Sequence, residues 1–322
     1  MTNKLKFAFR LNGFIDEYIL ELNYLKKLYS VFSENIEVTV FVDNDAELIR
    51  ILSSNQTFAK FENNENIEGV QNYDCVVDLL WRPKVIHANE KIIKKHSQGL
   101  FSVVKAWIDY NTDIHTIHTC EVNNSFLYPI TQYLLAHHKK IYTSLDIGNY
   151  FNINSIEYSI NSDNLKSNLP GSSNSNIKTI TISCPNICNT SEIDVKEKLE
   201  DVCKSIKNNC DGVKIVQLGD TNDLILDNID EYQKYEDASK LLMSLNASVF
   251  HIGVEGMGTH VRQSLPHRDS AAFFIDRTPE VWGYYSNINV EYSISLNGNL
   301  SMDPRMDVED YKTEIIRRIN RL

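Results

Sequence analysis

Short apolar runs alternate with amphipathic stretches along the whole chain, a pattern typical of strands linked by helices. In the first half it predicts strands at residues 6–11 and 36–43, with a helix over residues 15–32 between them. Further predicted segments are a helix near 46–52, strands at 57–61, 73–81 and 101–108, and a basic helical piece around 91–95. Strands joined by crossover helices predict a parallel sheet.

The alternation restarts after a polar stretch. Residues 162–176 lose all apolar periodicity and collect Ser, Asn, Pro and Gly, which is typical of an exposed linker. Beyond it, strands are predicted at 177–183, 213–219, 247–253 and 271–275, and helices at 191–207, 235–245, from 259 and from 308. We therefore expect two Rossmann-like, doubly wound α/β domains, over residues 1–161 and 177–322, joined by a linker over 162–176.

Ligands of such open sheets gather beyond the carboxyl ends of the strands. If the two domains face each other, one cleft lies between them. The loops expected to line this cleft follow residues 6–11, 180–183, 215–219 and 250–253.

Composition narrows the function classes. The chain has 322 residues and a net charge of -11, with Lys+Arg 32 against Asp+Glu 43, so it lacks the basic face that a nucleic-acid partner needs. The chain shows no signal-peptide pattern and no apolar run near ~20 residues, so we expect no transmembrane segment, while peripheral membrane contact stays open. The scattered cysteines suit the reduced thiols of a cytoplasmic protein.

The spacing of the Cys and His residues gives little support for a metal-binding site. Cys184 and Cys188 stand as C-x3-C, without a second pair or a nearby His at zinc spacing. His115 and His118 have the i, i+3 spacing that can ligate a metal on a helix, but no carboxylate cluster accompanies them, which favours an acceptor-side or core role. We expect neither a metal nor a cofactor.

The most distinctive segment is GVEGMGTHVRQSLP, from Gly253 to Pro266. It joins an apolar strand to a helix through a glycine-rich turn, which offers backbone N–H groups and a positive helix end to phosphates. Glu255 could hold sugar hydroxyls, and His260 could bind a phosphate or a sugar, so we interpret the turn as a donor-nucleotide pocket. A plain strand-to-helix turn, with a solvated Glu and a capping His, explains the segment about equally well.

Five segments, taken in order, resemble the GT-B glycosyltransferases, and within them the heptosyltransferase family that adds ADP-activated heptoses to bacterial surface glycans. RLNGFIDEYILELNYLKKL is similar to that family's first strand-turn-helix, and YDCVVDL to its buried YD-x-x-x-D-L strand. NASVFHIGVEGMGTH is similar to its strand that ends in an acid, a glycine, and a histidine five residues beyond the acid. DRTPEVWGYY resembles its Thr-Pro turn, and DVEDYKTEIIRRI its closing helix.

The resemblance implies two domains facing across a GT-B cleft. It also implies inverting transfer of a sugar from a nucleotide-diphosphate donor to a glycan or lipid-linked glycan, in bacterial surface polysaccharide assembly. Such chemistry requires a base near the acceptor hydroxyl. Asp16 matches the family's acid on the first loop and is the expected base, with Glu17 as the fallback. Alternatively, Asp16 is a helix cap or a first-turn acid. Gly13, His115 and His118 are expected on the acceptor side.

The donor side needs groups that neutralise the departing diphosphate. Gly256, Gly258 and Thr259 lie in the same turn as Glu255 and His260 and are assigned to the donor.

Two other loops of the second domain are also expected at the donor. Gln217 and Gly219 close a strand, where the nucleoside could rest against the backbone, although a plain turn explains this segment equally well. Arg277 and Thr278 follow strand 271–275. Arg277 is the candidate cation, although an arginine beside an aspartate is more often a surface ion pair.

The chain departs from the family at three points. Ile15 replaces the glycine before Asp16, and Met257 stands where a glycine precedes the histidine by three residues. Residues 183–192 read SCPNICNTSE, without the basic residue that the family places there for the diphosphate. Backbone N–H groups, hydroxyls or His260 would then have to bind the charged phosphates.

Two further function classes stay open. Nucleotide-sugar epimerases share the two-domain fold but need several His, Arg and acidic groups around the sugar, and few arginines lie near the predicted loops. A transferase-like protein that has lost catalysis, and binds only a sugar or a partner enzyme, would suit the missing basic residue.

Overall fold

The computed structural model divides the chain into two compact units, residues Met1–Ile160 and Asn161–Leu322. The residues it describes are 4–11, 18, 22, 25–26, 29, 33, 36–42, 46–53, 57–63, 70–78, 84–88, 177–185, 192–220, 223–235, 237–275, 288–294, 300–302 and 308–322. The predicted linker over 162–176 lies outside them, so its bounds stay a prediction.

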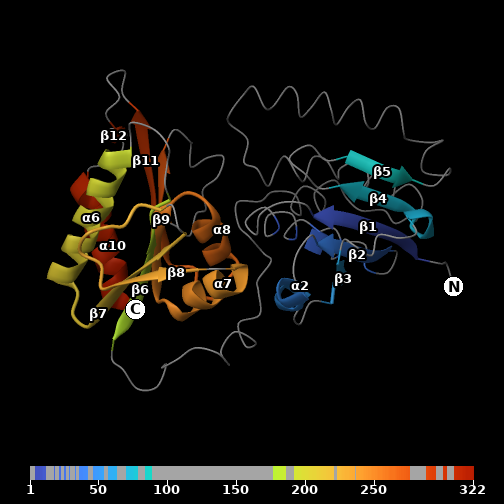
Figure 1. Cartoon of the computed structure of the whole chain (residues 1–322), viewed down its shortest axis with the longest axis horizontal. Helices are drawn as coiled ribbons and strands as arrows, with labels where there is room; N and C mark the ends of the chain where they lie inside the picture. The colour runs from blue at the N-terminus through green and yellow to red at the C-terminus, as the bar shows by residue number, and fades with distance from the viewer. Residues whose placement is uncertain are drawn as a thin grey trace, which may run out of the picture. The chain divides into compact units, whose positions relative to one another are not determined.

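The first unit contains a sheet with the strand order β3-β2-β1-β4-β5 (Figure 1). All neighbouring strands are parallel except β5, which runs antiparallel to β4. Its elements are β1 (Leu5–Leu11), β2 (Ile36–Val42), α2 (Ala46–Ser53), β3 (Lys60–Asn63), the short 3-10 helix η2 (Val70–Asn72), β4 (Cys75–Asp78) and β5 (Lys84–Ala88).

One face of the central strand of this sheet is apolar and buried. Phe7, Phe9 and Leu11 of β1 are almost completely buried. Tyr18, Leu22 and Leu25 are helical and fully buried, at the spacing that places residues on one face of a helix. These described positions agree with the helix predicted over residues 15–32.

The second unit contains a sheet with the order β12-β11-β10-β9-β6-β7-β8. Counted from β6, this is the Rossmann order 3-2-1-4-5-6 with one additional edge strand, and only β12 runs antiparallel to its neighbour. The strands are β6 (Lys178–Ser183), β7 (Val213–Gly219), β8 (Glu231–Lys234), β9 (Phe250–Val254), β10 (Ser270–Ile275), β11 (Ile288–Ile294) and β12 (Leu300–Met302). The order reverses between β6 and β9, which lie side by side.

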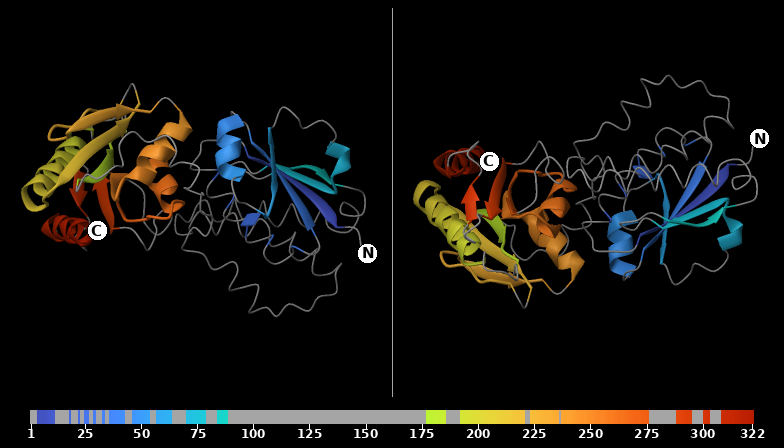
Figure 2. Two further views of the ribbon diagram at one scale, coloured as in Figure 1. Left: turned by 90° about the horizontal axis from the view of Figure 1, so that it is seen from below. Right: turned by 90° about the horizontal axis from the view of Figure 1, so that it is seen from above.

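Helices cover both faces of this second sheet (Figures 1 and 2). One face is covered by α6 (Glu192–Asn209) and α10 (Val308–Arg321), and the other by α7 (Ala238–Ala247) and α8 (Met257–Gln263). Asp237 caps α7, because its side chain accepts a hydrogen bond from the Lys240 amide. No helix in the described part of the chain is long and apolar enough to cross a membrane.

The predicted α/β class with parallel sheets is confirmed, and the local predictions need four corrections. The third strand occupies Lys60–Asn63 rather than residues 57–61, and α7 begins at Ala238 rather than at 235 because β8 precedes it. Strands β5, β8, β11 and β12 were not predicted. Two of them are antiparallel edge strands, which the expectation of a purely parallel sheet did not include. The predicted strand 101–108 and the helical piece around 91–95 lie outside the described residues.

Candidate functional site

The turn after β9 stands at the point where the strand order of the second sheet reverses. In open α/β sheets this switch point, at the carboxyl ends of the strands, is where ligands bind. Strand β9 ends at Val254, and α8 begins at Met257. Gly256 between them has a φ of 156°, a conformation that side chains disfavour, so glycine suits this position. The Glu255 amide donates to the Phe273 carbonyl at 2.8 Å and ties the turn to β10.

Glu255 and His260 form a buried pair across this turn. The distance between Glu255 Oε1 and His260 Nε2 is 3.0 Å, and the side chains are only 4% and 3% exposed. A carboxylate oxygen accepts, so the imidazole donates through Nε2 in this contact. The alternative of a solvated Glu255 is therefore wrong, because both side chains are held against each other inside the fold.

Two other donor candidates lie at the start of α8. The Thr259 side chain is fully buried, and its hydroxyl has no hydrogen-bond partner within the described part of the chain. Gly258 packs so closely on the sheet that a Cβ there would lie 2.8 Å from His251 Nε2. The absence of a side chain at residue 258 therefore permits the close approach of α8 to the strands below it.

A polar layer lies directly under the turn, on the strands β6 and β9. His251 Nδ1 is 3.1 Å from Thr181 Oγ1, and His251 Nε2 is 3.5 Å from Ser183 Oγ. Burial, together with the nearby Arg262 cation, lowers the pKa of His251 to about 3, so this imidazole is neutral at physiological pH. Ser183 pairs in register with Gly253, where a Cβ would lie only 2.2 Å from Ser183 Oγ.

Arg262 anchors this layer from α8. Its guanidinium is fully buried and donates to the carbonyls of Leu245 (2.5 Å), Ser248 (3.0 Å) and Val249 (2.9 Å), and to Ser248 Oγ (3.2 Å). Burial lowers the pKa of Arg262 to about 10, which leaves it charged near neutral pH. These bonds fix α8 to the segment between α7 and β9, and so fix the turn that carries Glu255.

The residues that follow β7 form a turn held by side-chain hydrogen bonds. The Gln217 carboxamide is fully buried, donating to the Leu224 carbonyl at 2.5 Å and accepting from the Leu226 amide at 2.9 Å. Gly219 leaves room for Tyr232, whose hydroxyl donates to the Asp220 carbonyl at 2.6 Å. A nucleoside could rest here against backbone rather than against the Gln217 side chain, and the donor role of Gln217 and Gly219 stays a prediction.

The remaining predicted site residues lie outside the described residues. They are the acceptor-side residues Gly13, His115 and His118, the acids Asp16 and Glu17, and the donor candidates Arg277 and Thr278.

Metal-ligating and reactive groups are sparse in the described part of the chain. It contains no group of three His, Cys, Asp or Glu side chains close enough to hold a metal ion. Cys75, Cys184, Cys203 and Cys210 are buried free thiols. Burial raises the pKa of Cys75, Cys184 and Cys203 to about 12, so these three are unreactive near neutral pH.

Sequence reasoning missed Ser183, His251 and Arg262. The signal for the first two was present: a histidine inside the apolar run SVFHI, and hydroxyls alternating with isoleucines in TITIS. Residues two apart on a strand share a face, so the hydroxyls of TITIS lie on one side of their strand. Arg262 gave no comparable signal, because an arginine in a helix is usually exposed.

No protein-family model matches the chain, and no curated protein matches it at a significant level. Among solved structures, the E. coli ADP-heptose lps heptosyltransferase II is similar with a TM-score of 0.59 and 12% identity, over 98% of this chain and 99% of that one. The dodecameric iron-containing glycosyltransferase TibC from enterotoxigenic E. coli H10407 is similar with a TM-score of 0.51 and 10% identity, over 89% of this chain and 64% of that one. TibC with ADP-D-beta-D-heptose gives 0.52 and 9%, over the same shares. The predicted resemblance to heptosyltransferases is confirmed at the level of the fold.

Proposed function

We propose that this chain is a glycosyltransferase that transfers a sugar from a nucleotide-diphosphate donor, with inversion, to a glycan or lipid-linked glycan acceptor. The observation that carries the proposal is the turn after β9, with its buried pair Glu255 and His260 at the switch point of a Rossmann-ordered sheet. The fold shared with heptosyltransferase II over nearly the full length of both chains supports it. TibC, of similar fold, has been solved with ADP-D-beta-D-heptose.

In this proposal the second unit binds the donor. Glu255 accepts hydrogen bonds from sugar hydroxyls, and His260 holds the Glu255 carboxylate in place. The buried Thr259 hydroxyl gains a partner from the ligand, since a buried hydroxyl that lacks one costs about 1–3 kcal/mol. Backbone N–H groups of the turn, with Arg277 and Thr278, meet the diphosphate.

The first unit would bind the acceptor and supply the base. Asp16 takes the proton from the acceptor hydroxyl as that oxygen bonds to the anomeric carbon of the donor sugar. The bond from this carbon to the diphosphate breaks at the same time, so the nucleoside diphosphate leaves with the electron pair. Glu17 is the second candidate for this base. The cleft between two such domains, and a role in surface polysaccharide assembly, belong to the same proposal.

A ligand screen tests the donor class first. A ligand that binds only the folded protein raises the melting temperature by mass action, so nucleoside diphosphates and nucleotide sugars should give the largest shifts. Glu255→Gln keeps the size of the side chain and an acceptor for His260 but removes its charge, and should weaken donor binding about tenfold. Glu231→Gln, on the exposed edge strand β8, is the matched control and should leave donor binding unchanged.

Product analysis then tests the reaction. Release of a nucleoside diphosphate only when acceptor is present supports transfer, whereas an epimerised sugar without acceptor would overturn the proposal in favour of an isomerase. Binding without turnover, with any acceptor tried, would favour a protein that has lost catalysis. Asp16→Asn should lower turnover ~10²- to 10⁴-fold while donor binding stays near normal. Near-normal turnover in this variant would instead assign Asp16 to helix capping.

A further inference from the structure

The Thr259 hydroxyl is a buried polar group without a hydrogen-bond partner in the described part of the chain. Thr259 is the third residue of α8, and its side chain is fully buried. A hydroxyl that leaves water without gaining a partner keeps the cost of its desolvation. Thr259 therefore destabilises the fold relative to an apolar side chain of the same shape.

The other polar side chains of α8 are paired. His260 contacts Glu255 at 3.0 Å, and Arg262 and Gln263 donate to backbone carbonyl groups. Buried polar groups in folded proteins nearly always have partners, so a group that lacks one calls for an explanation. Such departures concentrate at functional sites, and Thr259 lies in the first turn of the helix that follows the glycine turn at the switch point.

The backbone around this hydroxyl is anchored at two points, with two glycines between them. Before the turn, the Glu255 amide donates to the Phe273 carbonyl at 2.8 Å. After it, Arg262 holds α8 by its bonds to the segment between α7 and β9. Gly256 has a φ of 156°, and glycine changes its backbone angles at little steric cost. The first turn of α8 can therefore rearrange at Gly256 and Gly258 while the rest of the helix stays in place.

We propose that the first turn of α8 opens when the donor nucleotide binds, and that the Thr259 hydroxyl then forms a hydrogen bond with that ligand. The proposal rests on the proposed function, to which it adds an opening step at Gly256 and Gly258. A ligand shifts a conformational equilibrium only if it interacts differently with the two states. The hydroxyl supplies this difference, because it is unpaired in the closed turn and paired in the open one. Thr259 thus lowers the stability of the free protein and raises its affinity for the nucleotide.

The first test measures stability without added nucleotide. Thr259→Val replaces the hydroxyl by a methyl group of nearly the same shape and should raise the melting temperature by about 2–4 °C, because the unpaired polar group is gone. Thr181→Val is the matched control. Thr181 is also a buried threonine, but its hydroxyl is paired, 3.1 Å from Ser248 Oγ, so this variant should melt at a lower temperature than the wild-type protein. A lower melting temperature in Thr259→Val as well would overturn the proposal.

The second test measures affinity in the same variants. Titration calorimetry with ADP, UDP, ADP-glucose and UDP-glucose should show binding about tenfold weaker in Thr259→Val. Thr259→Ser keeps the hydroxyl and should bind within about threefold of the wild-type protein. The signature of the proposal is a higher melting temperature combined with a lower affinity in Thr259→Val. A residue that only supports the fold would change both in the same direction, and that result would overturn the proposal.

A cysteine reporter measures the opening itself. Thr259→Cys places a thiol in the first turn of α8, and Cys203, fully buried on α6, is the internal control. A soluble thiol reagent reacts only with molecules in which the site is open, so residue 259 should be modified at least ~10-fold faster than Cys203, as followed by peptide mass spectrometry. Equal rates at the two sites would mean that the turn opens only when the whole unit unfolds, which would overturn the opening step.

The outcomes also distinguish this proposal from the proposed function. If the wild-type protein binds a nucleotide and Thr259→Val binds it equally well, the role of Thr259 is overturned and the proposed function stands. If the wild-type protein binds neither nucleoside diphosphates nor nucleotide sugars, although residue 259 is modified faster than Cys203, the proposed function is overturned and the local opening stands. Absence of both binding and local opening overturns both.

Discussion

The two faces of the second sheet differ in their buried polar side chains. The face under α6 and α10 is mainly apolar: Ile180, Ile182, Phe250, Ile252 and Phe273 pack there with residues such as Leu199 and Tyr311. The face under α7 and α8 carries Thr181 and His251 at the neighbouring positions of the same strands, together with Arg262 from α8. The sheet therefore separates a mainly apolar layer from one that also contains a buried polar network.

The difference between the faces shows which side chains mainly stabilise the fold and which mainly fix the positions of particular atoms. Apolar packing is non-directional and stabilises the fold roughly in proportion to the area it buries. Buried hydrogen bonds add little net stability but fix the positions of particular atoms, and they are costly when broken. Ser183, the last residue of β6, lies on the polar face, and Glu255 directly follows the end of β9, so the directional network lies beside the candidate donor site.

The largest expected effect comes from removing the centre of the polar network. Arg262→Met should lower the free energy of unfolding by about 3–5 kcal/mol, because several buried carbonyl groups lose their donors at once. Urea unfolding measures this loss. Leu199→Ala on the apolar face should cost about 2–5 kcal/mol but leave nucleotide affinity unchanged at temperatures where the variant is folded. Near wild-type stability in Arg262→Met would contradict the distinction between the faces.

Acid should act on the polar face through His251. Between the unfolded-state pKa of 6.5 and the folded-state value of about 3, the unfolded chain binds the proton and the folded one does not. Stability therefore falls as pH drops through this window, by at most about 1.4 kcal/mol per pH unit.

A histidine variant isolates this contribution. His251→Gln removes the titrating group, so between pH 6.5 and pH 5 it should lose about 2 kcal/mol less than the wild-type protein, measured by urea unfolding at each pH. Identical pH profiles would show that His251 takes up its proton in the folded state as readily as in the unfolded one.

A smaller effect is expected where α8 approaches the strands. Gly258→Ala places a Cβ 2.8 Å from His251 Nε2, so α8 or the imidazole must shift, at a cost of about 1–3 kcal/mol. Both the melting temperature and the affinity for ADP should fall, because α8 begins in the turn that carries Glu255. A fall in melting temperature alone would mean that the turn is positioned independently of the polar layer.

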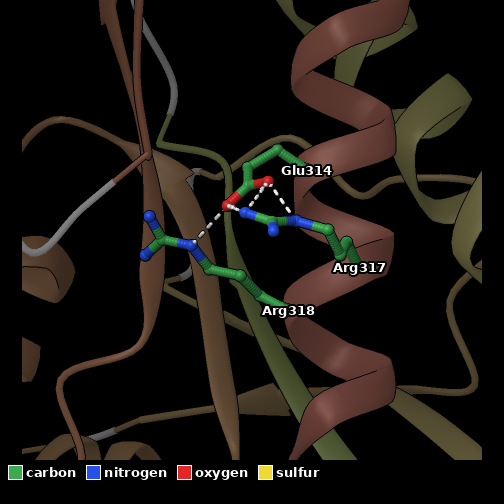
Figure 3. Close-up of polar contacts among 3 residues, drawn as sticks. All are labelled: Glu314, Arg317 and Arg318. Carbon is green, nitrogen blue, oxygen red and sulfur yellow. Dashed lines mark hydrogen bonds and ion pairs between the residues drawn. The ribbon is translucent and has the colours of Figure 1, made fainter.

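The smallest effect is expected on the exposed surface of α10 (Figure 3). Hydrogen bonds first from Arg317 and then from Arg318 lower the pKa of Glu314 to about 2, so the contribution exists above pH 4.5 and is lost as pH falls toward 2. Solvent screens this cluster, and Glu314→Gln should cost about 0.5 kcal/mol or less at neutral pH. Added salt should reduce the difference further, whereas a loss comparable to that of Arg262→Met would overturn this ranking.

Much of the fold followed from the sequence because its strands and helices have strong periodic patterns. The apolar strands β1, β6, β7, β9 and β10 and the helices α6 and α10 lie close to their predicted bounds. The short edge strands β5, β8 and β12 were missed, since an edge strand needs neither a long apolar run nor strict alternation. At the candidate site, local spacing predicted the glycine turn between a strand and a helix, and the donor role of Glu255 and His260 stays a prediction.

What the sequence by itself determined is the set of local segments, since periodicity and turn residues act over a few positions. The pairing of β6 with β9 was decided only by the tertiary structure, because it joins residues about 70 positions apart. That pairing makes a network of Thr181, Ser183 and His251. The fold also buries Glu255, which the alternative of a plain turn would leave in solvent. Burial, register and hydrogen-bond partners depend on which distant segments meet, and no local pattern carries that information.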